Sequence, residues 1–347
     1  MTTSPVTRLI IPEQTVSSDP VGGPAPNRRG RTIAWSAFGL FVVLDLVITK
    51  LRGHPSYVPE IGFGLNTGVP VVPTNADFPY VRSNNIVAIA LMGSLGLVGL
   101  GVATREYVLH RTLVPLFLAL GTILIVVPEV FVDIVGLVYY PTSPVDHAFT
   151  LFGRQMGYFI IAAWFGAGVF ALLMFKILQT RPTARTVWTV LAATCIAYTC
   201  FEELLVGAGG MYHYYGNQPM WWDRLPLWWT PCNTLGCALL PAAFAVRFLP
   251  LLRGWRAAVM LVVVPACLAG GYALIAMPSW VVVNGHYPWL VTQLAGLSTW
   301  ALGIGTAAVV MKVLLGYEPF DLRSRPALVE AAPAHKAAAR KTDGSIR

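Results

Sequence analysis

The sequence predicts an all-α membrane protein, a polytopic bundle of about eight transmembrane helices. Of the 347 residues, 56% are hydrophobic and only 12% are charged, whereas a soluble domain carries about a quarter charged residues. The apolar residues also gather in runs of about 20, the length that crosses the hydrocarbon of a bilayer as a helix. We therefore expect a multi-pass protein of the cell membrane.

Eight apolar runs form the predicted helices, because only a helix satisfies its own backbone hydrogen bonds inside lipid. They cover residues 33–49, 86–103, 112–138, 157–178, 187–207, 227–249, 256–278 and 288–315. Polar composition predicts a disordered arm at 1–30 and a mobile tail at 319–347, which leaves 31–318 as the membrane domain. The loop 50–85 is rich in Pro, Gly and Asn, so it is either a functional cap or a loose connector.

Basic residues set the predicted orientation of the bundle. With the N- and C-termini both cytoplasmic, 19 of the 24 Lys and Arg residues fall on the cytoplasmic side and five on the outer side. This asymmetry is the one that the positive-inside rule describes. The net charge of +8 is therefore a topology signal, and no nucleic-acid partner is expected.

Five acidic residues lie inside predicted helices, where a charged side chain costs about 2.5–3.5 kcal/mol and normally marks a site in the protein interior. They are Asp45, Glu129, Asp133, Glu202 and Glu203. Glu129 and Asp133 are four residues apart and share one helical face, beside a kink expected at Pro128. Carboxyls this close are coupled, so we expect one to hold a proton near neutral pH, as general acid–base catalysis needs. Glu202 and Glu203 point about 100° apart, so only one is expected to reach a shared pocket.

The predicted topology brings these acids to the outer half of the bundle. Asn233 and His286 fall at the same end. This convergence of polar groups predicts a pocket with acid–base chemistry. The alternative is that the acids pair with Arg154, Arg224 or backbone donors and only fix the packing of the helices.

The segment 201–233 is crowded with aromatic residues. They are Tyr212, Tyr214, Tyr215, Trp221, Trp222, Trp228 and Trp229, with His213 among them. An aromatic belt at the membrane interface accounts for them, and so does a pocket wall that stabilises a cation or shapes an apolar cavity.

Motifs of several other chemistries are missing from the sequence. No nucleotide-binding glycine motif, aspartate-rich diphosphate motif, histidine box or Ser/His/Asp set is visible. The five cysteines show no zinc-site spacing and are expected to be small core residues. Carboxylate chemistry without a metal or other cofactor is the simplest interpretation.

One stretch of about 35 residues carries a family pattern. It runs Glu202-Glu203, Gly210, Tyr212, Tyr214-Tyr215-Gly216, Pro219, then Leu225-Pro226-Leu227-Trp228-Trp229 and Asn233. In these residues the chain resembles the AveC-like spirocyclases of avermectin-type pathways. The resemblance implies that a spiroketal is formed from a dihydroxyketone polyketide, sometimes with a dehydration, in antibiotic biosynthesis and without a cofactor.

The residues and the resemblance together give a candidate site. Its catalytic members are Glu129, Asp133, Glu202 and Glu203. Its substrate-binding members are Asp45, Tyr212, His213, Tyr215, Trp228, Trp229, Asn233 and His286. A protonated carboxyl would expel water to give an oxocarbenium ion, and an ionised one would stabilise that cation and accept the last proton.

Two other functions remain open at this point. A terpene-type cyclase or isomerase would use the same carboxyls, and a proton-coupled carrier would use them as a proton relay. Against a carrier, no internal repeat is visible. The orientation also poses a question, because polyketides are made in the cytoplasm while the polar cluster is predicted on the outer side. Either the pocket opens sideways to lipid, or the substrate crosses first, or the orientation is reversed.

Overall fold

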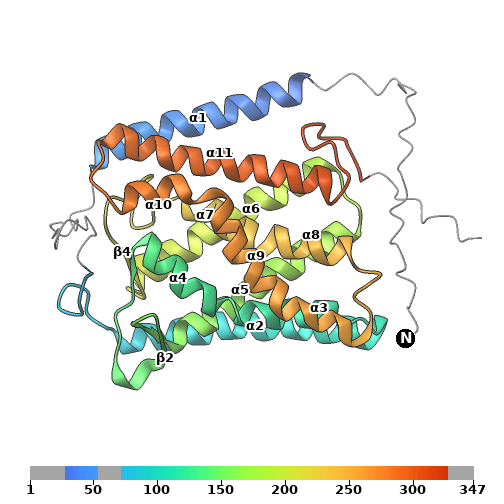
Figure 1. Cartoon of the computed structure of the whole chain (residues 1–347), viewed down its shortest axis with the longest axis horizontal. Coiled ribbons are helices and arrows are strands. Elements are labelled where there is room, and N and C mark those ends of the chain that lie inside the picture. The colour runs from blue at the N-terminus through green and yellow to red at the C-terminus, as the bar shows by residue number, and fades with distance from the viewer. Residues whose placement is uncertain (1–27, 54–71, 327–347) are drawn as a thin grey trace, which may run out of the picture.

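The computed structural model describes residues 28–53 and 72–326, and these residues form a helical bundle with little sheet (Figure 1). The arm up to residue 27, the middle of the predicted loop 50–85 and the tail from residue 327 lie outside the described residues.

Each predicted apolar run is helical in the structure. The helices are α1 (Arg28–Arg52), α2 (Arg82–His110), α3 (Val114–Ile123), α4 (Val126–Gly136), α5 (Tyr158–Gln179), α6 (Ala184–Glu202), α7 (Trp229–Asn233), α8 (Leu240–Arg247), α9 (Met260–Ile275), α10 (Met277–Val283) and α11 (Trp289–Val313). Two π-helical turns, η2 (Glu203–Ala208) and η3 (Thr234–Leu239), continue α6 and join α7 to α8. Two 3₁₀ turns, η1 (Pro144–Asp146) and η4 (Gly254–Val259), complete the helical elements.

Five stretches of the described chain are long and apolar enough to cross a membrane. They are Arg82–His110, Tyr158–Gln179, Ala184–Val206, Gly254–Ile275 and Trp289–Val313. The bent pair α3 and α4 makes a sixth if it counts as one span. The composition of these helices is that of a membrane protein, and the number eight and the cytoplasmic termini stay predictions.

The kink expected at Pro128 is confirmed, and it divides the predicted helix 112–138 into two. Pro128 has no N–H to give to the carbonyl of Leu124, one turn earlier. That carbonyl instead accepts the tighter bond from the Val127 N–H at 3.2 Å, and regular bonding resumes from Glu129 to Ile125 at 3.0 Å. The two halves meet at 43°.

The predicted helix 256–278 is also interrupted. α9 ends at Ile275, and Pro278 occupies the first turn of the short helix α10. Proline fits the first turn of a helix because the N–H that it lacks has no intrahelical partner there. The chain therefore starts a new helix at this point.

Two small antiparallel sheets, absent from the sequence prediction, lie at one end of the bundle (left in Figure 1). β1 (Val138–Tyr139) pairs with β4 (His213–Tyr214), and β2 (His147–Leu151) pairs with β3 (Arg154–Gly157). The first pair ties the end of α4 to the aromatic segment 201–233. We call this end of the molecule the strand end.

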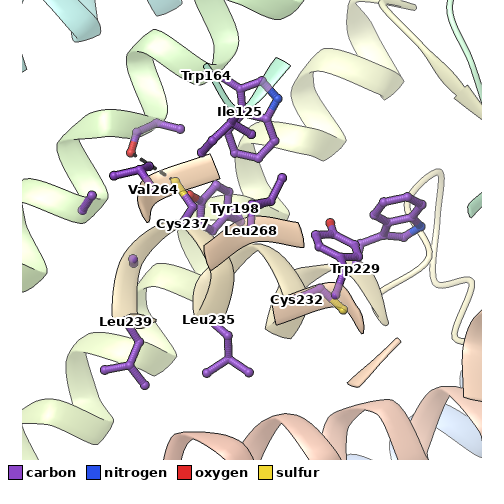
Figure 2. Packing of buried hydrophobic residues seen from close by; sticks show 14 of the residues in the cluster. Ile125, Trp164, Tyr198, Trp229, Cys232, Leu235, Cys237, Leu239, Val264 and Leu268 are labelled. Atoms are coloured by element: carbon purple, nitrogen blue, oxygen red, sulfur yellow. Dashed lines mark hydrogen bonds between the residues drawn. The ribbon is translucent and has the colours of Figure 1, made fainter. Parts of the chain in front are cut away.

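The continuous helix α7–η3–α8 runs through the core of the bundle. Figure 2 shows its side chains Cys232, Leu235, Cys237 and Leu239 among residues of neighbouring helices. It approaches α9 closely at Gly236, where an added Cβ would lie 2.8 Å from the Cα of Leu268. Cys232 and Cys237 are buried, as predicted for small core residues, whereas Cys195 and Cys267 are half-buried and Cys200 is exposed, so the prediction is wrong for Cys200.

Helix α1 lies at the edge of the bundle beside α11 (Figure 1). Its Phe41 ring packs 5.0 Å from the ring of Trp300 on α11. At the opposite end of the chain, residues after α11 fold back onto the start of α6, where the Ala184 N–H donates to the Ser324 carbonyl at 2.7 Å. The packed chain thus extends beyond residue 318, the predicted end of the membrane domain.

Candidate active site

A partly open cavity lies between α2, α4, α5, α6 and α7 near the strand end. Its volume is about 70 Å³, several times the roughly 10–15 Å³ that one water molecule needs. Its polar lining residues are Glu129, Asp133, Tyr140, Tyr198, Glu202, Tyr212, Tyr214, Trp229 and Asn233. The other lining residues are Met92, Phe159, Ile160, Ala163, Trp164, Ala167, Phe170, Phe201 and Leu205. An apolar cavity with a few convergent polar groups is typical of a small-molecule site.

Glu202 is the best-held carboxyl of the cavity. The Tyr214 hydroxyl donates to its Oε2 at 2.6 Å, and the Asn233 side-chain amide donates to its Oε1 at 2.8 Å. Asn233 is fixed in turn by the Tyr272 hydroxyl of α9, which donates to its Oδ1. Donors on both oxygens stabilise the negative charge of a carboxylate.

Two π-turns help to place the side chains of Glu202 and Asn233. Glu202 is the last residue of α6 before the π-turn η2, and Asn233 is the last residue of α7 before the π-turn η3. A π-turn changes the direction in which the following side chains point, and such turns are frequent at functional sites.

Glu129 and Asp133 line the cavity from α4, one helical turn apart. Their side chains are 7% and 3% exposed. Oε2 of Glu129 and Oδ2 of Asp133 have no hydrogen-bond partner among the described residues. No Lys or Arg in the described ranges forms an ion pair with either residue or with Glu202. The alternative that these three acids pair with Arg154 or Arg224 is therefore not supported.

Unpartnered polar atoms are concentrated at this cavity. Most of the buried side-chain polar atoms that lack a partner within the described chain belong to its lining residues, among them the indole N–H groups of Trp164 and Trp229. Buried polar groups of native proteins are normally hydrogen-bonded. The cavity therefore offers free donors and free acceptors to a bound molecule.

Tyrosines surround the carboxyls on the side of the strands. The rings of Tyr140 and Tyr212 lie 5.5 Å apart, and Tyr212 packs on Phe159 at 6.1 Å. Burial raises the pKa of Tyr212 well above its ordinary value, and the neighbouring Glu202 raises it further. Burial and Asp133 act in the same direction on the pKa of Tyr140. Both hydroxyls therefore stay protonated and remain hydrogen-bond donors.

Six of the predicted site residues meet in this cavity. They are Glu129, Asp133, Glu202, Tyr212, Trp229 and Asn233. The other six, Asp45, Glu203, His213, Tyr215, Trp228 and His286, do not line it.

Two predicted acids have local partners elsewhere. Glu203 is half-buried, and its Oε1 accepts the backbone N–H groups of Arg224 at 3.4 Å and Leu225 at 3.1 Å. Asp45 accepts the indole N–H of Trp222 at 2.9 Å and thereby joins α1 to the aromatic segment. Both carboxyls hold segments of chain together.

Four predicted binding residues also lie outside the cavity. The Tyr215 hydroxyl accepts a hydrogen bond from Arg154 at 3.0 Å. Trp228 is fully buried behind Trp229 and donates to Gln218 at 2.9 Å. His213 stacks 3.9 Å from Phe78, and burial lowers its pKa to about 4, so the ring is neutral. His286 is exposed in the turn between α10 and α11.

Sequence reasoning missed Tyr140, Trp164, Tyr198 and Tyr272. Tyr198 precedes Glu202 by four residues, and this spacing on one helical face was the signal that could have identified it. Trp164 and Tyr272 sit in apolar helices, where nothing in the local sequence separates a cavity residue from a core residue. Among the described residues, no group of three or more His, Cys, Asp or Glu side chains is arranged as metal ligands.

Gly136, the last residue of α4, lies directly against the cavity residue Trp229. A Cβ added there would lie 2.4 Å from the indole ring, so Gly136→Ala must displace the ring or the helix. We expect a loss of about 1–3 kcal/mol of stability, seen as a lower thermal midpoint in detergent. Gly101→Ala is the matched control, because a Cβ at Gly101 on α2 meets nothing within 4 Å. Equal midpoints for the two variants would contradict this packing.

The chain matches no protein-family model, no curated protein and no solved structure.

Proposed function

We propose that this protein is a membrane-embedded, cofactor-independent spirocyclase that forms a spiroketal from a dihydroxyketone polyketide. The observation that carries the proposal is the cavity in which Glu129, Asp133 and Glu202 face aromatic rings without a basic partner. The resemblance of residues 202–233 to the AveC-like spirocyclases supplies the reaction.

The reaction has three steps that these groups serve. One substrate hydroxyl adds to the ketone and gives a hemiketal. The hemiketal hydroxyl takes a proton from a carboxyl and leaves as water, which leaves an oxocarbenium ion. The second hydroxyl attacks the cationic carbon and gives its proton to a carboxylate. One water is released, and the protein ends with the same number of protons.

The contacts suggest a division of labour among the acids. Glu202, with donors on both oxygens, is the ionised group beside the cation. The pair of Glu129 and Asp133 shares a proton and donates it to the leaving hydroxyl. The faces of Tyr212 and Trp229 add cation–π stabilisation. Glu203 has no catalytic part in this scheme.

The arrangement in the membrane belongs to the same proposal. Eight segments cross the cell membrane, with both termini in the cytoplasm, as the distribution of Lys and Arg suggests. The helical segments available are α1, α2, α3 with α4, α5, α6, α7 with α8, α9 and α11. The partners are a small-molecule polyketide and the lipid bilayer.

A proton-coupled carrier is the second candidate function. Two carboxyls one turn apart inside an apolar bundle, each with an oxygen that has no hydrogen-bond partner among the described residues, also suit a proton relay. A terpene-type cyclase would use the same acids on an alkene or an epoxide, and the product separates it from a spirocyclase.

The test is an assay with purified protein in nanodiscs, without added cofactor. An acyclic dihydroxyketone is supplied, and spiroketal is followed by mass and by chiral chromatography. We expect product above the spontaneous rate, with one configuration at the spiro carbon in excess. Product at the spontaneous rate and ratio with several such ketones, together with proton-driven uptake of one of them into liposomes, would favour the carrier.

A further inference from the structure

The cavity is too small to enclose a long substrate. About 70 Å³ accommodates several water molecules or the polar end of a ligand. The remainder of a polyketide chain must therefore lie outside the cavity while its reacting end lies inside. The apolar lining residues farthest from the strand end indicate where that chain lies.

The lining reaches from the strand end to the middle of the bundle. Tyr140 and Tyr212 adjoin the strands β1 and β4, whereas the apolar Met92 on α2 and Phe170 on α5 lie ten and twelve residues from the starts of their helices. At 1.5 Å per residue these positions are about 15–18 Å along the helix axes. The apolar part of the cavity is thus level with the middle of the long helices.

The helices around this apolar part of the cavity pack more tightly on one side than on the other. α5 packs extensively on α2 and α3, but makes few contacts with α6 across the cavity. Near the strand end, the side-chain amide of Asn84 on α2 donates to the carbonyl of Gly209, after α6, at 3.0 Å. This bond links α2 to the end of α6 above a groove that has α5 as its floor.

Aromatic rings flank the opening of the groove. The ring of Phe170 lies 4.8 Å from that of Tyr198 and 6.4 Å from that of Phe201. Phe170 and Phe201 are both partly exposed, so they lie between the cavity and the outside of the bundle. Rotation of these two side chains would widen this opening without breaking a backbone hydrogen bond.

The outer surface of the two flanking helices is apolar. Val87 and Leu91 on α2 are 65% and 45% exposed, and Ile196 on α6 and Leu204 on η2, which continues α6, are 65% and 52% exposed. Both helices are among those long and apolar enough to cross a membrane. A molecule arriving at Phe170 therefore comes from lipid.

We infer that the cavity is loaded sideways from the bilayer, between α2 and α6, by an amphiphile with a hydroxyl-bearing head and an apolar chain. The head reaches the carboxyls, and the chain stays in the groove past Phe170 and Phe201. This inference rests on the proposed function only in taking the head to be the reacting part. It also removes the conflict between a cytoplasmic source of substrate and a polar cluster on the outer side, because a molecule dissolved in lipid reaches the groove from either leaflet.

The test is photolabelling in phosphatidylcholine nanodiscs, which needs no turnover. The probe is a sixteen-carbon alkyl dihydroxyketone with a diazirine in mid-chain, and the reference probe is the same alkyl diazirine without the head. Illumination inserts the carbene into neighbouring side chains, and peptide mass spectrometry locates the adducts. We expect the headed probe to concentrate on the α5 and α6 peptides that contain Phe170 and Phe201, and the reference to spread over the lipid-facing helices.

Two variants narrow the entrance, one from its floor on α5 and one from its wall on α6. Phe170→Trp and Phe201→Trp are each expected to lower the concentrated labelling about tenfold, equivalent to about 1.4 kcal/mol of binding. Val262→Trp is the matched control, because Val262 on α9 is 68% exposed on another side of the bundle and should change nothing. An unchanged thermal midpoint in nanodiscs shows that each variant is folded.

The possible results test the proposed entrance independently of the proposed reaction. Concentrated labelling that both tryptophans reduce supports the entrance even if no spiroketal forms. Labelling spread as for the reference probe, concentrated on α1 and α11, or unchanged in both variants overturns it, even if the spirocyclase assay succeeds.

Discussion

Glu202→Gln is expected to lower turnover by about 10²- to 10⁴-fold, the range typical of lost acid–base groups. The variant keeps the size of the side chain and an oxygen that accepts from Asn233 or Tyr214, but it removes the negative charge from beside the cation. The measurement is kcat for spiroketal formation in nanodiscs, with the thermal midpoint as a check that the bundle is intact.

Glu203→Gln is the matched control for this prediction. It makes the same chemical change one residue away, and its side-chain oxygen still accepts the backbone N–H groups of Arg224 and Leu225. We expect its kcat to stay within about twofold of the wild type, as for a group outside the site. Equal losses in the two variants, or full activity in Glu202→Gln, would remove Glu202 from the mechanism.

Glu129→Gln and Asp133→Asn are each expected to lower turnover at least about tenfold. In the proposed mechanism the two carboxyls share one proton, so the double variant should be little worse than the poorer single variant, as for residues that act as a unit. Both singles should be at least as stable as the wild type, because each removes a buried carboxyl that lacks a basic partner. Multiplicative losses in the double variant would show that the acids act independently.

Glu106→Gln provides the contrast in stability. Glu106 is also a buried acid, but Lys176 lies 2.8 Å from its carboxylate. Removing one member of this ion pair should lower the thermal midpoint and leave turnover unchanged, since Glu106 lies outside the cavity. An unchanged midpoint would mean that the pair contributes little to the fold.

Much of the helical architecture followed from local sequence. Apolar runs predicted every long helix, and Pro128 predicted the kink between α3 and α4, because both depend on residues close in sequence. The strands β1 and β4 did not follow, because two residues are too few to show an alternating pattern and their pairing joins residues 138–139 to 213–214. Helix α10 was missed because Pro278 was included in the preceding helix.

The candidate site was predictable only where helical spacing decided it. The four-residue interval placed Glu129 and Asp133 on one face, and the angle between Glu202 and Glu203 separated cavity from surface. Nothing local distinguishes Trp229 from Trp228, since both are buried and only the packing of α4 and α7 brings the first to the cavity. Asp45 was misplaced because its helix lies at the edge of the bundle.

Stabilisation of a cation between Glu202 and the aromatic rings is the step on which the proposed reaction depends. The most direct measurement compares the binding of a cyclic ammonium ion, a mimic of the oxocarbenium ion, with that of its neutral carbocyclic isostere. By calorimetry in nanodiscs, the ammonium ion should bind at least about 100-fold more tightly, as transition-state mimics do. Glu202→Gln should remove most of this difference. Equal affinities of the wild-type protein for the two compounds would contradict cation stabilisation in this cavity.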